Sequence, residues 1–431
     1  MENKHRTYEI RCPVHGFIGF SDWEREVINH PTFQRLRRIR QLAWTDQVYP
    51  GATHTRFEHS LGVMHIAGQL FDALARSSPD VLKPADGFTP DALKRDKQIV
   101  RFAALLHDTG HGPFSHAAED LFPEIAKGRH YKHEAYSGAA IRYSLKDAIE
   151  NHPLNDAAIK ADEIADLLES NSRAGRLLLW RDLIDGQMDA DRMDYLLRDS
   201  LHIGVDYGRY DWRRLLNTVR IIEMPPPGED SPTALRIGVS EGGVHAAEAM
   251  VLARYYMFTQ VYFHKTRVAY DHHFQKAMKS ILGGKPFPPP TADGIGEYLA
   301  WNDWRVLGCL AEGGGEEHGR RLRERDHYRQ VYHTPEMALD ADHILLTVIE
   351  NSLDTLVAAN KSSKTSTYKL QAADISVVSA DGCGRVMPLS HHSCVVRDLN
   401  KYSLEIVRLY STPENAAVAR AKVAALQEKL K

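Results

Sequence analysis

Apolar residues recur at helical spacing in several stretches of the first two thirds of the chain. In the segment 57–74 they fall at every third or fourth position, at Leu61, Met64, Leu70, Phe71 and Leu74, which predicts an amphipathic helix. Residues 99–107 are apolar almost throughout, so a buried helix is expected there. The segment 182–199 combines apolar residues with several acids and predicts a helix with two different faces.

Glycine- and proline-rich stretches interrupt these patterns. EMPPPGEDSPT at 223–233 separates two apolar runs, LLNTVRII and LRIGVSE, and predicts a two-stranded excursion with a long loop. Similar breaks at 283–291 and 311–317 bracket a short helical piece. Beyond residue 326 the strand candidates are TYKLQAADISVVS and SLEIVRLY, and residues 414–431 read as a terminal helix.

The predicted fold is mainly α, with a helical core and a small mixed α/β C-terminal region. The expected division is a core over residues 1–282, a linker with a short helix over 283–325, and the mixed region over 326–431.

Composition narrows the class of protein. Of the 431 residues, 43% are hydrophobic and 26% charged, which is ordinary for a chain that buries a substantial core. The net charge of −3 does not indicate nucleic-acid binding, although a local basic patch such as RLRRIR at 35–40 remains compatible with it. Four cysteines without a C-x-x-C pair, a polar N-terminus and the lack of an apolar run of ~20 residues predict a soluble, cytoplasmic chain with no membrane segment.

Histidine is the unusual residue type: there are 23, and eight of them lie between His54 and His133. In LLHDTGHGPFSH, residues 105–116, a buried apolar helix runs directly into His107 and Asp108. A buried carboxylate is costly unless it is paired or binds a metal. Taken alone, however, this pair would more often be a core histidine beside a helix-capping aspartate.

Two further segments change that balance. RFEHSLGVMHIAG, residues 56–68, places His59 and Arg56 on one helical face. DADRMDYLLRD, residues 189–199, places Asp191, Tyr195 and Asp199 in one polar stripe, which by itself could be a solvated acidic face. Two histidines and two aspartates together would form a mixed nitrogen and oxygen site that suits manganese, iron, zinc, nickel or magnesium, and the sequence does not choose among them.

The motifs R-F-E-H-S-L-G, H-D-T-G-H-G-P-F-S-H and D-x-x-x-Y-x-x-x-D, in this order, resemble the HD-domain phosphohydrolase superfamily. Within it they look most like the deoxynucleoside triphosphate triphosphohydrolase branch, which includes bacterial dGTPase-like enzymes and the SAM-and-HD-domain dNTPase. The likeness extends through PVHGFIGF (13–20), HPTFQRLRRIRQL (30–42), YKHE (131–134) and VYFHK (261–265), over roughly the first two thirds of the chain.

The resemblance implies a role for each matching position. It implies as metal ligands His59, His107, Asp108 and Asp191. Around the scissile phosphate it implies Arg56, His111, His116, Glu119 and His133. For phosphates and sugar it implies Arg192, Tyr195, Arg254 and Lys265, and for deoxyribose and base Gln41, Leu42 and Asp199. In the family, water attacks the α-phosphorus and triphosphate leaves whole. A divalent transition metal (Mn, Fe, Zn or Ni), possibly with Mg, and a homo-oligomer, dimer or tetramer, are implied as well.

Some positions depart from the family pattern. Cys12-Pro13 stands where Asp-Pro is frequent, and Glu119 replaces an aspartate but keeps the carboxylate. Asn29 replaces an acid that reads guanine in nucleotide-activated relatives, although Arg37 is kept. Phe258 stands where some relatives carry a histidine near the substrate. Guanine-nucleotide activation and the identity of the substrate are therefore left open.

Three functional hypotheses follow. The leading one is an enzyme that hydrolyses dNTPs to deoxynucleoside and triphosphate. A second keeps the site but acts as a phosphatase or phosphodiesterase on another nucleotide or an oligonucleotide end. The third is a nucleotide-sensing module with little turnover, which the combination of His116, Glu119 and His133 argues against. The remaining histidine pairs, at 272–273 and 391–392, and His30 are expected to be surface or structural residues.

Overall fold

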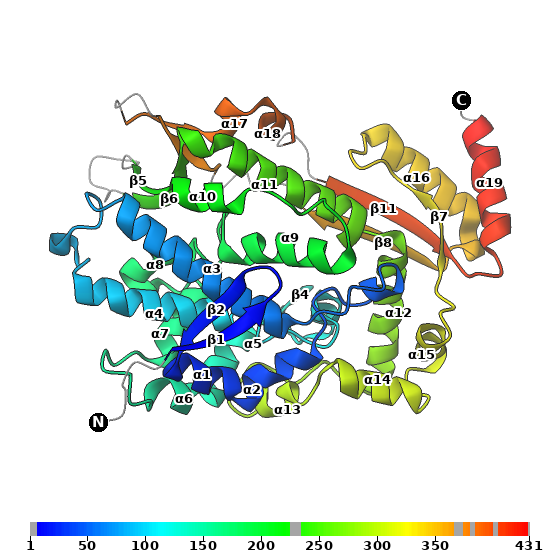
Figure 1. The fold of residues 1–431 in the computed structure, drawn as a ribbon. Helices are drawn as coiled ribbons and strands as arrows, with labels where there is room; N and C mark the ends of the chain where they lie inside the picture. The colour runs from blue at the N-terminus through cyan, green and yellow to red at the C-terminus, as the bar shows by residue number, and fades with distance from the viewer. Residues whose placement is uncertain (1–6, 225–233, 366–373, 380–383, 400–403, 430–431) are drawn as a thin grey trace.

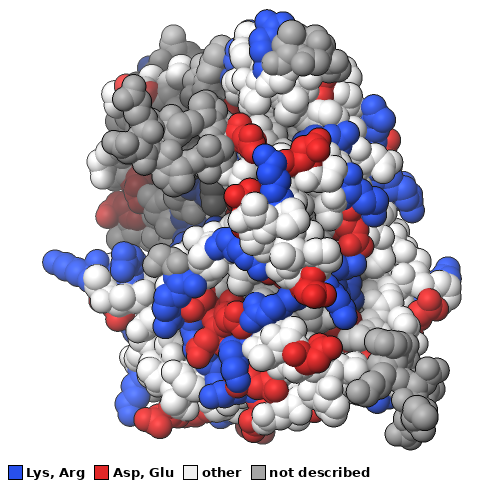
Figure 2. Space-filling model, turned by 90° about the vertical axis from the view of Figure 1, so that its left-hand side faces the viewer, with Lys and Arg blue, Asp and Glu red and all other residues white. Residues whose placement is uncertain are grey.

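The structure, a computed structural model, describes residues 7–224, 234–365, 374–379, 384–399 and 404–429. Helices dominate, and short strands gather into small sheets, two of them in the C-terminal part (Figure 1), so the predicted mainly α fold is confirmed. Within the described residues, no helix has both the length and the apolar character needed to cross a membrane. On the face shown in Figure 2, basic and acidic side chains of the described residues are interspersed rather than separated into a basic stripe.

Three helices form the centre of the N-terminal part. Helix α3 (Arg56–Ser77) packs against α4 (Pro90–Leu106) on one side and α9 (Ala190–Ile203) on the other. The helix predicted over 57–74 is confirmed as α3, and the buried helix predicted over 99–107 is the last part of α4. Most of the apolar side chains of α3 and α4 are fully buried. Because this packing fixes the two helices, the residues at their ends are held rigidly.

The helix predicted over 182–199 starts later than expected. Residues 182–189 form turns, and α9 begins at Ala190 because the Asp189 side chain accepts a hydrogen bond from the Arg192 amide at 2.7 Å. An aspartate at this position satisfies one of the free amides of the first helical turn, which sets the start of a helix. Asp189, which the sequence pattern placed inside the predicted helix, is thus the N-terminal cap of α9.

Shorter helices surround this centre. They are α1 (Asp22–Asn29), α2 (Pro31–Gln34), α5 (His133–Ala139), α6 (Lys146–Glu150), α7 (Ala161–Leu168), α8 (Leu178–Arg181), α10 (Trp212–Thr218), α11 (Val244–Met257) and α12 (Lys265–Ile281). A 3₁₀ segment, Ser115–Leu121, follows the turn after α4. His30 caps α2 by accepting a hydrogen bond from the Thr32 amide, so its predicted structural role is confirmed.

The strands of the described residues form four small sheets. Two hairpins pair β1 (Thr7–Cys12) with β2 (Gly16–Ser21) and β3 (Glu124–Ala126) with β4 (Arg129–His130). A four-stranded sheet has the order β10 (Val386–Pro388), β9 (Ser376–Val378), β6 (Ala234–Ser240), β5 (Val219–Met224), with β6 parallel to β9 and the other pairs antiparallel. The fourth sheet has three strands in the order β7 (Arg329–His333), β11 (Leu404–Ser411), β8 (Ala359–Thr365), all antiparallel.

These sheets correct two strand predictions. The antiparallel pair around 223–233 exists, but it is half of a four-stranded sheet, and the LLNT part of its first run belongs to α10. Of SLEIVRLY, residues 404–410 are confirmed as part of β11, and Ser403 lies outside the described residues. Of TYKLQAADISVVS only 376–378 is a strand, and 367–373 lies outside the described residues. The C-terminal strands pair with strands that are distant in sequence, and a local sequence pattern does not reveal such pairing.

The C-terminal region adds its own apolar core. Helix α16 (Asp340–Leu353) and the terminal helix α19 (Ala416–Lys429) pack with the sheet of β7, β11 and β8 through Ile349, Leu409 and Ala419. The predicted terminal helix is therefore confirmed. Two short helices, α17 (Leu389–His392) and α18 (Cys394–Leu399), lie against α11.

Residues 283–325 contribute helices α13 (Ile295–Leu299), α14 (Asp303–Ala311) and α15 (Glu316–Arg323). Phe287 and Tyr298 share an apolar core with Phe114 and Phe274, so this segment is packed against the N-terminal part. The division of the chain at residues 282 and 325 stays a prediction. What the packing shows is that α13 and α14 reach the turn that follows α4.

Candidate metal centre

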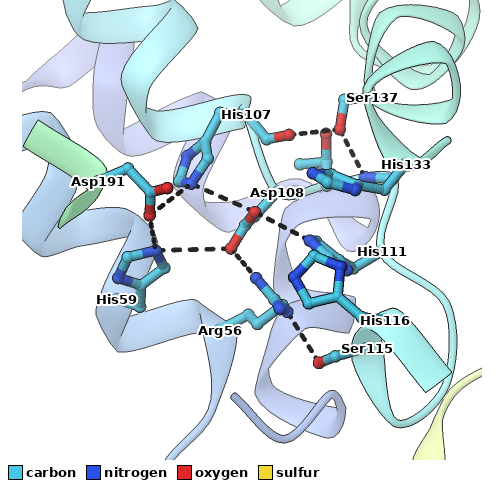
Figure 3. Close-up of polar contacts among 12 residues, drawn as sticks. Arg56, His59, His107, Asp108, His111, Ser115, His116, His133, Ser137 and Asp191 are labelled. Atoms are coloured by element: carbon cyan, nitrogen blue, oxygen red, sulfur yellow. Dashed lines mark hydrogen bonds and ion pairs between the residues drawn. The ribbon is translucent and has the colours of Figure 1, made fainter. Parts of the chain in front are cut away.

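Three elements bring the predicted metal ligands together. His59 stands in the first turn of α3, His107 and Asp108 directly follow the C-terminus of α4, and Asp191 stands in the first turn of α9. Figure 3 shows their side chains converging on one point between the three elements. The ligands come from helix ends, where neighbouring residues can point at the same position.

The distances within this cluster are short. His59 Nε2 lies 3.0 Å from Asp191 Oδ1 and 3.6 Å from Asp108 Oδ2. His107 Nε2 lies 3.2 Å from Asp108 Oδ1 and 3.7 Å from Asp191 Oδ1. The donor atoms of His59, His107 and Asp191 all lie within 4.8 Å of one another, and the Asp108 carboxylate borders them. Such a group can surround one ion.

The donor atoms fit a divalent cation. Among the described residues, the Nε2 atoms of His59 and His107 are buried and make no hydrogen bond. The other nitrogen of each ring is held in place: His107 Nδ1 lies 2.7 Å from the Ala104 carbonyl oxygen, and His59 Nδ1 lies 2.8 Å from Asp194 Oδ2. Each Nδ1–H therefore donates, and each Nε2 faces the cluster, where a metal ion would take the place of a proton, as in metal-binding histidines.

The electrostatics also favour a cation. Burial alone would lower the pKa of His59, but the Asp191 and Asp194 carboxylates outweigh it and raise this pKa to about 10. Burial raises the pKa of Asp108, yet the Arg56 guanidinium beside it and the neighbouring histidines hold this pKa well below its usual range. The carboxylates thus stay charged at neutral pH and attract positive charge to the cluster.

A second group of titratable side chains adjoins the first. His111, His116, Glu119 and His133 have donor atoms within 4.8 Å of one another. Glu119 Oε1 lies 2.7 Å from His133 Nδ1 and 3.0 Å from His116 Nδ1. The rings of His111 and His133 stack at 3.8 Å, and His111 Nε2 lies 3.2 Å from Asp108 Oδ1, so this group touches the metal ligands directly.

Exposure and charge differ within this group. The side chain of His116 is 60% exposed, whereas that of His133 is 16% exposed. Burial lowers the pKa of His133, but the hydrogen bond to Glu119 and the charge of Glu134 raise it overall. Burial, Arg56 and His133 together hold the pKa of His111 well below its usual value. The group therefore contains both a neutral imidazole and one that holds its proton, as acid and base chemistry requires.

The turn between the two groups is held on one side by Arg35 and Ser137. The fully buried Arg35 guanidinium donates to the carbonyl oxygens of Thr109 at 3.2 Å and His111 at 2.9 Å. The Ser137 hydroxyl donates to the His107 carbonyl oxygen at 2.5 Å and accepts from the Gly110 amide at 2.9 Å. A Cβ at Gly110 would overlap the backbone of α5, so only glycine allows this approach.

Residues 283–325 hold the other side of the same turn. The Tyr298 hydroxyl of α13 donates to the Gly110 carbonyl oxygen at 2.6 Å, and Asp303 of α14 accepts from the Phe114 amide at 2.8 Å. Phe114 and Ser115 have positive φ angles of 54° and 60°, which non-glycine residues seldom adopt. These hydrogen bonds stabilise the conformation that aims His111 and His116 at the cluster.

A cavity of about 220 Å³ opens on both groups. Among the predicted site residues, those that line it are Gln41, Arg56, His107, Asp108, His111, His116, His133, Asp191 and Tyr195. His59 lies behind its wall, fully buried, and Glu119 lies behind His116 and His133. The structure thus brings together all the predicted metal ligands and phosphate-proximal residues.

Other predicted substrate residues do not line this cavity. Leu42 is buried in the apolar core, and Asp199 lies 2.8 Å from His54 Nε2 and accepts from the Tyr262 hydroxyl at 2.7 Å. Arg192 donates to the Gly186 carbonyl oxygen. Arg254 contacts Thr365 at 3.4 Å and lies over the Phe258 ring. Lys265 lines a separate small cleft with Tyr410 and Arg420.

Sequence reasoning did not single out several residues of the site. Asp194 contacts His59, His15 and Arg198, whose side chains are all buried. The sequence spacing could have indicated Asp194 as a site residue, because it stands three residues after Asp191 and therefore on nearly the same face of α9. Arg181, the last residue of α8, and Asp185, in the turns that follow it, line the cavity from a segment that carries no recognisable pattern, so only the fold places them there.

Two family descriptions match the chain. The HD domain matches residues 56–199, which contain all four candidate metal ligands. The HD associated region matches residues 211–428, about half of the chain.

Comparison with known proteins also finds relatives of similar sequence and structure. YwfO, an uncharacterised protein of Bacillus subtilis, is 37% identical over 259 residues, which cover 59% of this chain and 51% of YwfO. The deoxynucleoside triphosphate triphosphohydrolase SAMHD1 of Gallus gallus is 33% identical over 232 residues, or 49% of this chain and 36% of that protein. The chain thus spans about half, or less, of the length of these curated relatives. A crystal structure of a hypothetical protein from Aquifex aeolicus, 26% identical, matches with a TM-score of 0.77 over 97% of this chain and 100% of its own.

Proposed function

The chain belongs to the family of HD-domain proteins that carry an HD associated region, and on this premise we propose that it is a metal-dependent phosphohydrolase. The substrate proposed is a deoxynucleoside triphosphate, cleaved to deoxynucleoside and inorganic triphosphate. The observation that supports this best is the buried cluster of His59, His107, Asp108 and Asp191 with a histidine and glutamate group beside it.

The proposed ligands are His59 and His107 through Nε2, with the carboxylates of Asp108 and Asp191. A divalent cation bound there supplies a Lewis acid and lowers the pKa of bound water. Manganese, iron, zinc and nickel all suit two imidazoles and two carboxylates, and magnesium could accompany them.

The chain's own groups account for the rest of the reaction. Arg56, fixed between Asp108 and Ser115, presents a guanidinium to the phosphate at the cavity wall. Arginine suits phosphate oxygens because its planar fork donates two parallel hydrogen bonds. Arg192, Arg254 and Lys265 stay proposed contacts of the outer phosphates, and Gln41, Leu42, Tyr195 and Asp199 those of the deoxyribose and base.

The leaving group needs a proton. When water attacks the α-phosphorus, the bond to the nucleoside 5′-oxygen breaks, and this oxygen is a poor leaving group unless protonated. His116 is the proposed donor, with Glu119 to orient its ring, and His133 is the alternative because it shares the same carboxylate oxygen. His111, Arg56 and the remaining ring then contact phosphate and water.

A panel of substrates tests the proposal. Purified protein would be incubated with each dNTP, NTP and nucleoside monophosphate in the presence of Mn²⁺, Fe²⁺, Zn²⁺, Ni²⁺ or Mg²⁺, with Asp191→Ala as the inactive control. Release of triphosphate from dNTPs supports the proposal, whereas release of orthophosphate or pyrophosphate alone contradicts it. A homo-oligomer, dimer or tetramer, is proposed from the family resemblance and is measured by light scattering of the same sample.

A further inference from the structure

A second and larger cavity adjoins the metal centre. It measures about 700 Å³ and lies between α8, the turns at 182–188 and the strands β6 and β9. Arg181 and Asp185 line both this cavity and the smaller one at the metal ligands. The two spaces therefore share a wall made of two side chains.

The volumes of the two cavities indicate how much of a ligand each can hold. Pockets for small-molecule ligands usually measure about 300–1,000 Å³. The cavity at the metal ligands, at about 220 Å³, falls below this range, while the neighbouring one falls within it. The smaller space, lined by the candidate metal ligands together with Gln41 and Tyr195, takes the phosphate and the sugar end of one nucleoside, and the larger one can take a further unit of nucleoside size.

The lining of the large cavity indicates what that unit is. Phe88, Leu178, Met188 and Ile237 supply apolar surface. The charged lining is balanced, with three arginines (Arg176, Arg181 and Arg236) against three aspartates (Asp182, Asp185 and Asp374). A polyphosphate would need an excess of positive charge. An uncharged nucleoside, with apolar ring faces and polar edges, fits such a mixed lining better.

Arg181 stands where the two spaces meet. One of its terminal nitrogens, Nη2, pairs with Asp185 Oδ2 at 2.5 Å, and its Nε is buried with no hydrogen-bond partner among the described residues. A buried N–H group without a partner is costly, which suggests that a ligand supplies the acceptor. A phosphate oxygen between the cavities would lie within its reach.

We propose that the large cavity is a subsite for a second nucleoside, so that a deoxydinucleotide phosphodiester is also a substrate. The inference rests on the proposed function of the metal centre. The phosphate would lie at the metal ligands, one nucleoside beside Gln41 and Tyr195, and the other beyond Arg181 in the large cavity. Water adds its oxygen to phosphorus, the bond to one ester oxygen breaks, and that oxygen takes a proton, which gives one nucleotide and one nucleoside.

Two matched substrates separate this subsite from the metal centre. Deoxydinucleotides, d(NpN), carry the second nucleoside, whereas p-nitrophenyl esters of deoxynucleoside 5′-phosphates keep the diester and lack it. Leu179→Trp places a large ring in the large cavity, and Leu339→Trp, at a position 67% exposed before α16, is the matched control. Ile237→Phe is a smaller change at the same cavity, used if Leu179→Trp does not fold as judged by thermal unfolding.

The expected result is a loss confined to one substrate. Leu179→Trp should lower kcat/KM for d(NpN) by about tenfold, mostly through KM, while the p-nitrophenyl ester changes less than about twofold. The control variant should affect neither substrate. Equal effects on both substrates, no effect on d(NpN), or failure of the wild-type protein to cleave d(NpN) while it cleaves dNTPs would overturn the subsite and leave the proposed function standing. If no nucleotide is cleaved with any metal, the proposed function fails and the subsite with it.

Discussion

Asp194 Oδ2 lies 2.8 Å from Nδ1 of His59, and this contact fixes which nitrogen of His59 faces the candidate metal centre. The other Asp194 oxygen lies 2.6 Å from His15 Nε2, and Arg198 pairs with both oxygens. The carboxylate can approach α3 this closely because residue 62 is glycine, where a Cβ would overlap it. Asp194 therefore orients a proposed metal ligand without reaching the cavity itself.

Asp194→Asn is expected to weaken metal binding by about 10–100-fold, the usual cost of losing a group that orients a metal ligand. An amide can present its N–H to His59 and favour the wrong tautomer, although its size is unchanged. Metal content after dialysis against graded chelator measures the effect. Asp206→Asn is the control, since Asp206 lies at the surface beside Arg209. Equal metal affinity in both variants would show that Asp194 has no role in the centre.

The two rings that share Glu119 are expected to differ in their response to the leaving group. His116→Ala should lower kcat on dNTPs by about 10²–10⁴ and lose much less activity on a p-nitrophenyl phosphodiester, whose leaving group needs no proton. His133→Ala should affect both substrates alike. Metal content should stay the same in both variants. If His133→Ala shows the dependence on the leaving group instead, the proton donor is His133.

The contact between His133 and Glu119 predicts a dependence of stability on pH. Because its pKa is raised on folding, the stabilisation from protonated His133 is fully present below its unfolded pKa of about 6.5 and is lost as pH rises through the raised value. Glu119→Gln removes the hydrogen bond that raises this pKa most. Denaturant unfolding of both proteins between pH 5.5 and pH 9 is the measurement. The deficit of the variant should be largest at the acidic end and shrink toward pH 9, and a constant deficit would contradict this explanation.

Tyr195 is expected to select the sugar. Its ring stands one helical turn after Asp191 and lines the cavity, so it would lie beside the ribose of a nucleotide whose phosphate contacts the metal ligands. A 2′-hydroxyl would crowd the ring, which gives a preference for dNTPs over NTPs. Tyr195→Ala should reduce the ratio of the two kcat/KM values. Equal values for dNTP and NTP in the wild-type protein would exclude this role.

Tyr298→Phe tests whether residues 283–325 support the site. The variant removes the hydroxyl that donates to the Gly110 carbonyl oxygen and leaves that buried acceptor without a partner, which costs about 1–3 kcal/mol. The free energy of unfolding should fall by this amount, and kcat should fall while metal content is kept. Tyr143→Phe, at a position 53% exposed, is the matched control. A stability equal to wild type would show that the contact does not hold the turn.

The sequence predicted the residues that carry the chemistry of the site better than it predicted the contacts that hold these residues in place. His59, His107 and Asp108 fall in helix ends that apolar periodicity marks clearly, and the motifs that contain all four candidate metal ligands, Asp191 included, are short and local. The same periodicity predicted α3 and part of α4, and the alternation of alanine with charged residues predicted α19. It placed the start of α9 too early, since the capping role of Asp189 depends on a hydrogen bond rather than on pattern.

Contacts between residues far apart in the sequence could not be predicted from local sequence patterns. Tyr298 and Asp303 reach the turn after α4 across more than 180 residues of sequence, and strand β9 joins β6 in the same way. The predicted contacts of Leu42, Asp199 and Lys265 with substrate depended on the resemblance alone. In the structure Leu42 is buried in the apolar core, Asp199 accepts from the Tyr262 hydroxyl and Lys265 lines a separate cleft, so their roles stay predictions.

The most direct test of the central claim is hydrolysis of a dNTP in water enriched in ¹⁸O, with mass analysis of both products. The proposed attack on the α-phosphorus predicts one ¹⁸O atom in inorganic triphosphate and none in the deoxynucleoside, with no product from Asp191→Ala. Label in the deoxynucleoside, or deoxynucleoside monophosphate and pyrophosphate as the products, would contradict the account.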